Sequence, residues 1–309
     1  MTIRVVKPGL LTTVQDRGRY GYAHLGISPC GAADAMSLRI ANLLVGNEEY
    51  AGALEMTLLG ATLEFEEKAI VAITGASCEC KAGSNRIAAN APVEMATGSV
   101  LQCGSTTDGA RCYLAIQGGV DVTAVMGSCS TDLRGRFGGH EGRRLQAGDV
   151  LHVGQPGRAR QRRLRVDVRD GVRGAGAIRV TSGAQRDWFS SDTYAKFLAT
   201  GYVVSEQSDR AGLRLKGDAV ETRESKQLLT DGIPLGAIQV PQDGQPIILF
   251  VDQQTTGGYP KIANVVAADM HRVGQLRPRD EVRFAEISIP EATDALQAQE
   301  RWLVELWQD

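Results

Sequence analysis

The stretch GIPLGAIQVPQDGQPIILFVDQQTTGGYPKI, residues 232–262, predicts two strands and a polar loop. The apolar run at 237–240 predicts a short strand, and the run at 247–251 predicts a strand buried on both faces. Residues 241–244, PQDG, predict a turn, because proline presets φ and glycine tolerates positive φ. The loop at 252–260, DQQTTGGYP, is dense in hydrogen-bonding groups and glycines, which is typical of ligand contacts on a rigid scaffold. An ordinary solvated hairpin end is the alternative interpretation.

Composition places the chain among globular proteins that do not bind nucleic acid or membranes. The 309 residues predict two domains, each with enough chain for a core. The net charge of −2 argues against a nucleic-acid or membrane-surface partner. The 36 glycines and the aromatic content of 5% favour turns and short strands over long helices.

The N-terminus and the cysteines predict a cytoplasmic protein. The first residues, MTIRVVKPGLL, lack the apolar region of a secretory signal, and no apolar run approaches the length of a membrane span. The six cysteines are therefore expected to be reduced thiols. Cys78 and Cys80 stand close together, but no second Cys/His pair follows at a zinc-like spacing, so we predict no metal site.

The first half of the chain has the pattern of a barrel or a sandwich. Alternating apolar runs at 54–58 and 61–65 predict paired strands, and the run at 70–74 predicts another. Asp34 is placed to cap the clearest helix of this half, which Gly46 and Asn47 would end. Short apolar runs then recur to Val153 with glycine or polar residues between them.

The second half begins after a strongly basic segment. We predict domains at 1–157 and 177–309, joined by a basic connection at 158–176. A nucleic-acid patch is the alternative for that connection, but it lacks interleaved aromatic residues. Ser190 is expected to cap a short amphipathic helix, and a C-terminal helix is expected from about Pro290.

Several standard catalytic motifs are absent from the sequence. It contains no GxxxxGK[ST] phosphate loop, no GxGxxG fingerprint, no GxSxG elbow and no HExxH motif. Cys30, in a glycine-flanked loop, is a weaker candidate nucleophile because no histidine adjoins it. Any chemistry is therefore expected from carboxylates, amides, hydroxyls, cationic side chains and backbone N–H groups.

Long segments of the chain resemble the allophanate hydrolase subunit 2 family, also described as biotin-dependent carboxyltransferase-like. The similar segments include TTVQDRGRYGYAHLGISPCGAADAMSLRIANLLVGN, VMGSCSTDLRGRFGGHEGRRLQAGD, SEQSDRAGLRLKG and DQQTTGGYPKIA. Members include the carboxyltransferase domain of urea amidolyase and the C subunit of bacterial 5-oxoprolinase, and ISPCGA and MGSCSTDL are most similar to the latter branch. The resemblance implies a mainly β fold with few helices: two cyclophilin-like β-barrel domains side by side and a C-terminal helix.

The resemblance also implies an activity and partners. It implies one component of an ATP-dependent 5-oxoprolinase, a hydrolase that opens the lactam of 5-oxo-L-proline (pyroglutamate) to L-glutamate together with subunits A and B. ATP, accompanied by Mg²⁺, would be bound by this chain or with a partner subunit. A lactam is an amide stabilised by resonance, and phosphorylation of its oxygen would make it a better electrophile.

Two other functions are open at this point. One is a biotin-dependent carboxyltransferase that moves a carboxyl group from carboxybiotin to a small amide. Nothing here resembles the Met-Lys-Met turn that carries biotin, so the biotin would arrive on another chain. The other is a non-catalytic regulatory subunit that antagonises a kinase inhibitor.

The family-like motifs contain the candidate site residues. Asp16, Asp34 and Glu55 are the candidate general bases. The candidate substrate or phosphate contacts are Arg210, Gln239, Gln245, Asp252, Thr255, Thr256, Gly257, Gly258, Tyr259 and Lys261. Arginine can pair bidentately with a carboxylate or phosphate, and the Thr-Gly turn can donate protons to an oxyanion.

Each candidate also has a purely structural interpretation. Asp16 and Asp34 could cap turns and helices. Arg210 could belong to a buried ion pair, and Gln239 could satisfy the end of a strand.

Overall fold

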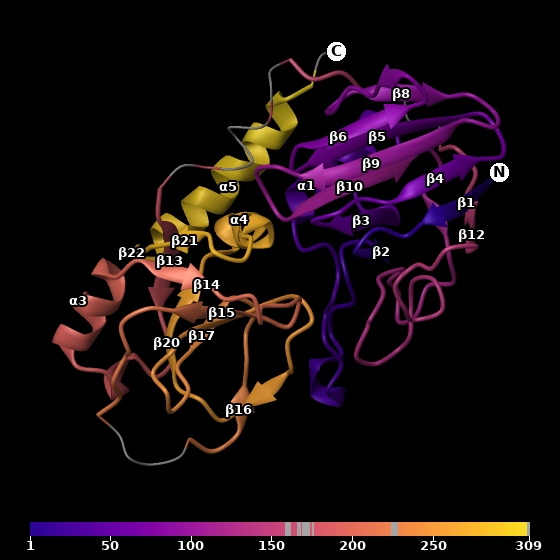
Figure 1. Cartoon of the computed structure of the whole chain (residues 1–309). Coiled ribbons are helices and arrows are strands. Elements are labelled where there is room, and N and C mark those ends of the chain that lie inside the picture. The colour runs from indigo at the N-terminus through magenta and orange to yellow at the C-terminus, as the bar shows by residue number, and fades with distance from the viewer. Residues whose placement is uncertain (158–161, 166–167, 169–173, 175, 224–227, 308–309) are drawn as a thin grey trace. The chain divides into compact units, whose positions relative to one another are not determined.

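The computed structural model describes the chain except residues 158–161, 166–167, 169–173, 175, 224–227 and 308–309. The chain divides into two compact units. Unit 1 comprises Met1–Arg19, Cys30–Arg173 and Glu305–Asp309, and unit 2 comprises Tyr20–Pro29 and Gly174–Val304. Strands dominate and helices are few, as predicted (Figure 1).

This division differs from the predicted boundaries at two segments. Residues 20–29 belong to unit 2, where the Ser28 hydroxyl donates a hydrogen bond to the backbone carbonyl of Gln253. The end of the chain belongs to unit 1, where Trp307 forms a β-bridge with Leu164. Long-range pairing of this kind leaves no signal in local sequence patterns. Much of the predicted basic connection lies outside the described residues.

Unit 1 consists of two sheets around one apolar core. The first has the order β11 (Val120–Asp121), β12 (Val150–Val153), β1 (Thr2–Lys7), β4 (Thr62–Phe65), β9 (Val100–Thr106), β6 (Cys78–Ala82), β7 (Asn85–Arg86). The second has the order β2 (Leu11–Gln15), β3 (Ala53–Thr57), β10 (Arg111–Ile116), β5 (Ala69–Gly75), β8 (Pro92–Met95).

Several pairs of successive strands in unit 1 are divided between the two sheets, which brings both sheets over the same core. Strand β1 continues into β2, β3 into β4, β5 into β6 and β9 into β10, each pair with one member per sheet. Inward-facing side chains such as Ile3, Leu54 and Leu114 are fully buried in that core. Helix α1 (Ala35–Leu44) packs against β5 and β10 and begins at Asp34, whose carboxylate accepts from the Ser37 N–H at 2.9 Å. The predicted helix cap is confirmed.

Unit 2 is built on a sheet that nearly closes on itself. Its order is β21 (Glu281–Val282), β14 (Tyr202–Val204), β15 (Gly212–Lys216), β18 (Ile247–Leu249), β17 (Ala237–Gln239), β20 (Lys261–Val265), β13 (Ile178–Ser182), β22 (Phe284–Glu286). Only Arg283 separates β21 from β22, so one continuous segment pairs with both ends of the sheet. This arrangement nearly closes the sheet into a barrel.

Two features of the predicted hairpin in unit 2 are confirmed. Strands β17 and β18 pair as antiparallel neighbours, with Ile238 opposite Ile248. In the turn between them Gly244 has φ 71° and its N–H donates to the Pro241 carbonyl at 3.0 Å. Beyond β18, strand β19 (Thr256–Gly257) pairs with β16 (Asp231–Gly232) as a separate two-stranded sheet.

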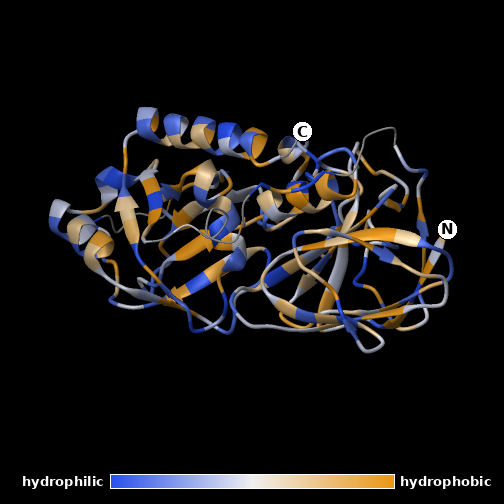
Figure 2. Ribbon diagram, turned by 90° about the horizontal axis from the view of Figure 1, so that it is seen from above, coloured by the Kyte–Doolittle hydropathy of each residue, from blue (hydrophilic) through white to orange (hydrophobic). Residues whose placement is uncertain are grey.

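Among the described residues, unit 2 contains three helices. They are α3 (Ser191–Ala199), α4 (Met270–Gln275) and α5 (Ile289–Glu305), with 3₁₀ turns η2 (Arg186–Trp188), η3 (Ala267–Asp269) and, in the 20–29 segment, η1 (Ala23–Leu25). The Ser190 hydroxyl caps α3 as predicted. Hydrophilic and hydrophobic residues alternate along α5 (Figure 2). Within the described residues, no helix combines the length and the apolar character needed to cross a bilayer.

Candidate functional site

Asp16, the first predicted base, lies directly after β2 and is buried. Its carboxylate accepts hydrogen bonds from the Ser128 hydroxyl at 2.6 Å, the Cys129 N–H at 2.6 Å and the Ser130 hydroxyl. It also accepts from the Gly18 N–H at 2.7 Å. These bonds fix the loop that carries Ser128–Ser130 against the end of β2. The geometry favours an anchoring role, and a catalytic role for Asp16 stays a prediction.

Asp34 and Glu55 are also buried and hydrogen-bonded. Asp34 is occupied as the cap of α1. Glu55, on β3, accepts from the Ala33 N–H at 2.8 Å and the Tyr113 hydroxyl at 2.7 Å, and Arg111 Nε lies 3.6 Å from its other oxygen. Burial and the two carboxylates raise the pKa of Tyr113, so its phenol stays a proton donor to Glu55. This network fixes the entry of the chain into α1.

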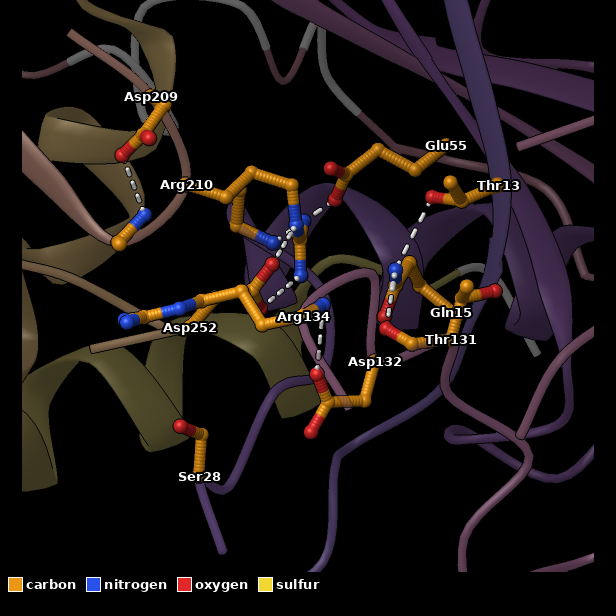
Figure 3. Close-up of polar contacts among 12 residues, drawn as sticks. Thr13, Gln15, Ser28, Glu55, Thr131, Asp132, Arg134, Asp209, Arg210 and Asp252 are labelled. Carbon is orange, nitrogen blue, oxygen red and sulfur yellow. Dashed lines mark hydrogen bonds and ion pairs between the residues drawn. The ribbon is translucent and has the colours of Figure 1, made fainter. Parts of the chain in front are cut away.

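Unit 1 also contains several buried side-chain atoms that make no hydrogen bond within the described residues. Two of them, Nη1 of Arg19 and Oε1 of Gln15, belong to side chains that contact the loop at 128–131. The Arg19 guanidinium is 2% exposed, lies 4.8 Å from the centre of the Phe137 ring and donates through Nη2 to the Ser130 carbonyl. Gln15 donates to the Thr13 hydroxyl at 3.0 Å and contacts the Thr131 carbonyl at 3.4 Å (Figure 3). Within the described residues, Arg19 therefore has an open donor beside Ser130, and Gln15 has an open acceptor beside Thr131, the next residue of the same loop.

In unit 2, Arg210 and Asp252 form a bidentate ion pair. Arg210 Nε and Nη2 each lie 2.9 Å from an oxygen of Asp252, and both side chains are 4% exposed (Figure 3). The Asp252 N–H donates to the Arg210 carbonyl at 2.9 Å, which ties the start of the polar loop to the segment that leads into β15. The structure therefore brings the predicted site residues Arg210 and Asp252 together, and the Arg210 guanidinium is paired with this carboxylate of the same chain.

A second polar cluster of unit 2, which we call the β19 cluster, consists of Asp231, Gln239, Gln254, Gly257 and Lys261. Gln239 ends β17 and stands opposite Lys261 in the ladder. The Lys261 ammonium is buried and lies 3.0 Å from Asp231 Oδ2. This contact lowers the pKa of Asp231. The ion pair holds β16 and its partner β19 over β20.

Close packing at Gly257 explains why glycine stands there. A Cβ atom at this position would lie 2.7 Å from Ile233 Cδ1, 3.2 Å from Gln239 Nε2 and 3.7 Å from Gln254 Nε2. Two side-chain amides therefore converge on the backbone of β19. Gln239 also contacts the Tyr259 carbonyl through Nε2 at 3.3 Å.

The polar loop exposes some of the predicted contacts and buries others. Thr256 and Tyr259 are exposed, and Thr255, Gly257 and Gly258 are half-buried. These groups are therefore accessible to a ligand in unit 2.

Gln245 has a different position from the β19 cluster. Its amide exchanges two hydrogen bonds with the backbone of Gly217, at 3.0 Å and 3.2 Å. This side chain is committed to fixing the chain after β15. Its predicted contact with a substrate stays a prediction.

Sequence analysis did not single out Gln15, Arg19, Gln253 or Gln254. Gln253 is buried, donates to the Ile233 carbonyl at 3.0 Å and retains an unpaired Oε1 among the described residues. Arg19 carried a usable signal, because it is a charged residue beside a glycine in the family-like segment TTVQDRGRYGY. Its burial, which makes it informative, could not be predicted from that segment.

Comparison with known proteins identifies the family. Residues 25–286 match the family described as carboxyltransferase domain, subdomain A and B. The chain is 41% identical to the C subunit of 5-oxoprolinase from Escherichia coli strain K12, over 98% of this chain and 97% of that protein. It is 36% identical to the corresponding 5-oxoprolinase subunit of Haemophilus influenzae, over 94% of this chain and 93% of that protein.

A solved structure agrees with this assignment. The crystal structure of the Kluyveromyces lactis urea carboxylase matches 98% of this chain with a TM-score of 0.90 and 32% sequence identity. This chain corresponds to 29% of that much longer protein. The matches in sequence and in structure lead to one conclusion: the chain belongs to the carboxyltransferase-domain family, subdomains A and B.

Proposed function

We propose that this chain is the C subunit of an ATP-dependent 5-oxoprolinase that opens 5-oxo-L-proline to L-glutamate. The observation that carries the proposal is the 41% identity to a protein named as that subunit, since the match extends over nearly all of both chains. The name of that relative also supports a multisubunit enzyme, with subunits A and B as the partners of this chain.

The substrate contacts that we propose lie in the β19 cluster and its loop. The amides of Gln239 and Gln254 converge on Gly257, and Thr256 beside it is exposed. A lactam presents one N–H donor and one carbonyl acceptor, and side-chain amides match both. The hydroxyl of Thr256 and neighbouring backbone N–H groups can donate to an oxygen that gains negative charge during ring opening.

Unit 1 has two polar atoms of its own that could bind a ligand carrying both a negatively charged group and a hydrogen-bond donor. Arg19 Nη1 is a buried donor without a hydrogen-bond partner in the described residues, and Gln15 Oε1 is a buried acceptor in the same situation. A guanidinium pairs well with a carboxylate. We propose these two atoms as the polar contacts that unit 1 itself supplies.

The cations predicted to meet phosphate do not fit that role well in this structure. Arg210 is engaged by Asp252, and Lys261 is engaged by Asp231. This pairing favours ATP and its Mg²⁺ being held by a partner subunit, and we propose that arrangement. Among the described residues, no group of three or more His, Cys, Asp or Glu side chains is arranged to hold a metal ion.

The alternative is a carboxyltransferase that receives a carboxyl group from biotin carried by another chain. The TM-score of 0.90 to a urea carboxylase favours it, because the two share this domain architecture. Both activities would use small amide substrates.

Reconstitution separates these functions. We would purify the chain with its candidate A and B subunits, supply 5-oxo-L-proline, ATP and Mg²⁺, and measure glutamate and ADP. Glutamate that forms only when all three chains are present supports the proposal. Biotin-dependent carboxylation of a small amide, without glutamate, would establish the carboxyltransferase instead. A stable complex with neither activity would indicate a regulatory subunit.

A further inference from the structure

Four of the six cysteines gather in the core of unit 1. The Sγ of Cys78 lies 3.2 Å from that of Cys80 and 3.7 Å from that of Cys112. Cys103 stands opposite Cys80 in the ladder between β6 and β9. Of the four, Cys78 is half-buried and the others are buried. The cluster therefore has one thiol that a small molecule in solution can reach.

The backbone of β6 explains why Cys78 and Cys80 meet. Residues two apart on a strand point to the same face, and the intervening Glu79 is exposed on the other. The pairing of β6 with β9 shifts register between the two cysteines. Such a bulge bends the strand locally and re-aims side chains. A disulfide needs sulfurs about 2.0 Å apart, so the two Sγ atoms, which lie 3.2 Å apart, must approach each other by about 1 Å to form one.

Cys78, Cys80 and Cys112 differ in how readily their thiols ionise. The hydrogen bonds that Cys78 shares with Cys112 and Cys80 lower its pKa. Contacts with the other thiols and burial raise the pKa of Cys80 and of Cys112. The reachable thiol is thus the one that ionises most readily, and thiolates are the nucleophiles in disulfide exchange. A second thiol within contact distance is the arrangement of a nucleophile and its resolving cysteine.

We propose that Cys78 and Cys80 form a redox-sensitive dithiol, which a low-molecular-weight disulfide oxidises to an intramolecular disulfide bond. This proposal is independent of the function proposed above, because it concerns thiols that the β19 cluster and the Asp16 loop do not use.

The chemistry proceeds in two exchange steps. The Cys78 thiolate attacks one sulfur of the small disulfide, forms a mixed disulfide and releases one small thiolate. Cys80 then loses its proton to water or to the released thiolate and attacks Sγ of Cys78, which releases the second small thiolate. The two protein thiols lose two electrons, and the small disulfide gains them to become two thiols.

Oxidation of the intact chain tests the proposal. The folded protein would be incubated with oxidised glutathione, its remaining thiols alkylated, and its peptides mapped by mass spectrometry. We expect a loss of two hydrogen atoms in mass and a peptide in which Cys78 is linked to Cys80. The Cys80→Ala variant should instead accumulate glutathione on Cys78, and Cys78→Ser should form neither product. Circular dichroism of each variant checks that the fold is retained.

Cys129 provides the matched control. It is also half-buried, but burial and the nearby Asp16 raise the pKa of its thiol. Cys129→Ser should oxidise as the unmodified chain does, and at pH 6 iodoacetamide should alkylate Cys78 at least ~10-fold faster than Cys129. Linkage of Cys78 to Cys112, linkage of Cys80 to Cys103, or equal oxidation of the Cys78→Ser variant would each overturn the proposal.

Discussion

Unit 1 and unit 2 bury their candidate carboxylates in different ways. In unit 1, Asp16 is surrounded by neutral donors, the hydroxyls of Ser128 and Ser130 and two backbone N–H groups. In unit 2, Asp252 faces the charged fork of Arg210. Neutral donors to a carboxylate fix backbone segments relative to each other, whereas an arginine fork fixes a side chain and neutralises its charge.

This difference changes how a mutational loss of activity must be interpreted. Removing either carboxylate leaves buried partners unsatisfied, so the variant can lose activity because it unfolds. Thr256 is exposed at the edge of the β19 cluster. Among the described contacts, its side chain makes no hydrogen bond that stabilises the fold. The contrast between the two units can therefore be tested by measuring stability and activity together.

The largest effect is expected for Asp16→Ala. The substitution leaves four donors without their acceptor, three of them buried and that of Cys129 half-buried, and each unpaired buried donor costs about 1–3 kcal/mol, so we expect the free energy of unfolding to fall by at least about 4 kcal/mol. Urea denaturation followed by circular dichroism measures this. Glu48→Ala, which removes an exposed carboxylate of unit 1, is the control and should leave stability nearly unchanged. A stable but inactive Asp16→Ala protein would instead show that Asp16 is catalytic.

A slightly smaller loss is expected for the ion pair of unit 2. Arg210→Met leaves Asp252 buried without the arginine fork, and breaking such a pair costs about 3–5 kcal/mol. The double variant with Asp252→Leu removes the stranded charge and should be more stable than the single variant. Thermal and urea unfolding of all four proteins complete the cycle. Additive losses would contradict the pairing.

Thr256→Ala should lower activity without lowering stability. The residue is exposed, so we expect the free energy of unfolding to change by less than about 0.5 kcal/mol. Loss of a hydroxyl that donates to the reacting oxygen should lower kcat of the reconstituted enzyme at least ~10-fold. Thr293→Ala, which removes an exposed threonine from α5, is the matched control and should retain full activity. Full activity of Thr256→Ala would remove this hydroxyl from the proposed site.

The smallest effect is a pH dependence in unit 2. Burial alone would raise the pKa of Asp269, but the side chain and N–H of Arg179 and the charge of Arg272 together hold it below 3.8. A lowered carboxyl pKa contributes stability that is fully present above the unfolded value and is lost as the pH falls through the folded value. Unfolding free energies measured between pH 6 and acid pH, about 4 and below, should therefore decline more steeply in the unmodified chain than in Asp269→Asn.

The control for that experiment is Asp294→Asn, on the exposed surface of α5. This variant should keep the steep decline of the unmodified chain. If the unfolding free energy of Asp269→Asn declined at acid pH as steeply as that of the unmodified chain, the Arg179 contact would not stabilise unit 2.

Much of the fold was predictable because its signals are local. The run at 247–251 predicted β18, the PQDG turn formed as expected, and Asp34 and Ser190 cap their helices. Alternation of apolar residues depends on the two-residue period of a strand, and caps depend on the unpaired N–H groups of a helix start. Each of these two signals, the apolar alternation and the helix cap, is carried by a few neighbouring residues of the sequence.

The candidate site was predictable only in part. The polar loop 252–260 was found from its composition, and Gln239, Lys261 and Gly257 do converge in the structure. A buried ion pair of Arg210 was foreseen as an alternative to ligand binding, but the sequence did not identify Asp252 as the partner. The burial of Gln15 and Arg19, which leaves polar atoms of both open, could not be predicted, because burial depends on segments far away in the chain.

Sequence alone was enough to recognise the family, to place many of the strands and helices and to name the residue types available for chemistry. The folded arrangement was needed to learn which of these groups are already engaged: Asp16 with the loop at 128–130, Lys261 with Asp231, and Cys78 with Cys80 and Cys112. Hydrogen bonds and ion pairs form between neighbours in space. Those neighbours are brought together by a core whose contacts connect residues far apart in sequence, and local patterns carry no record of such contacts.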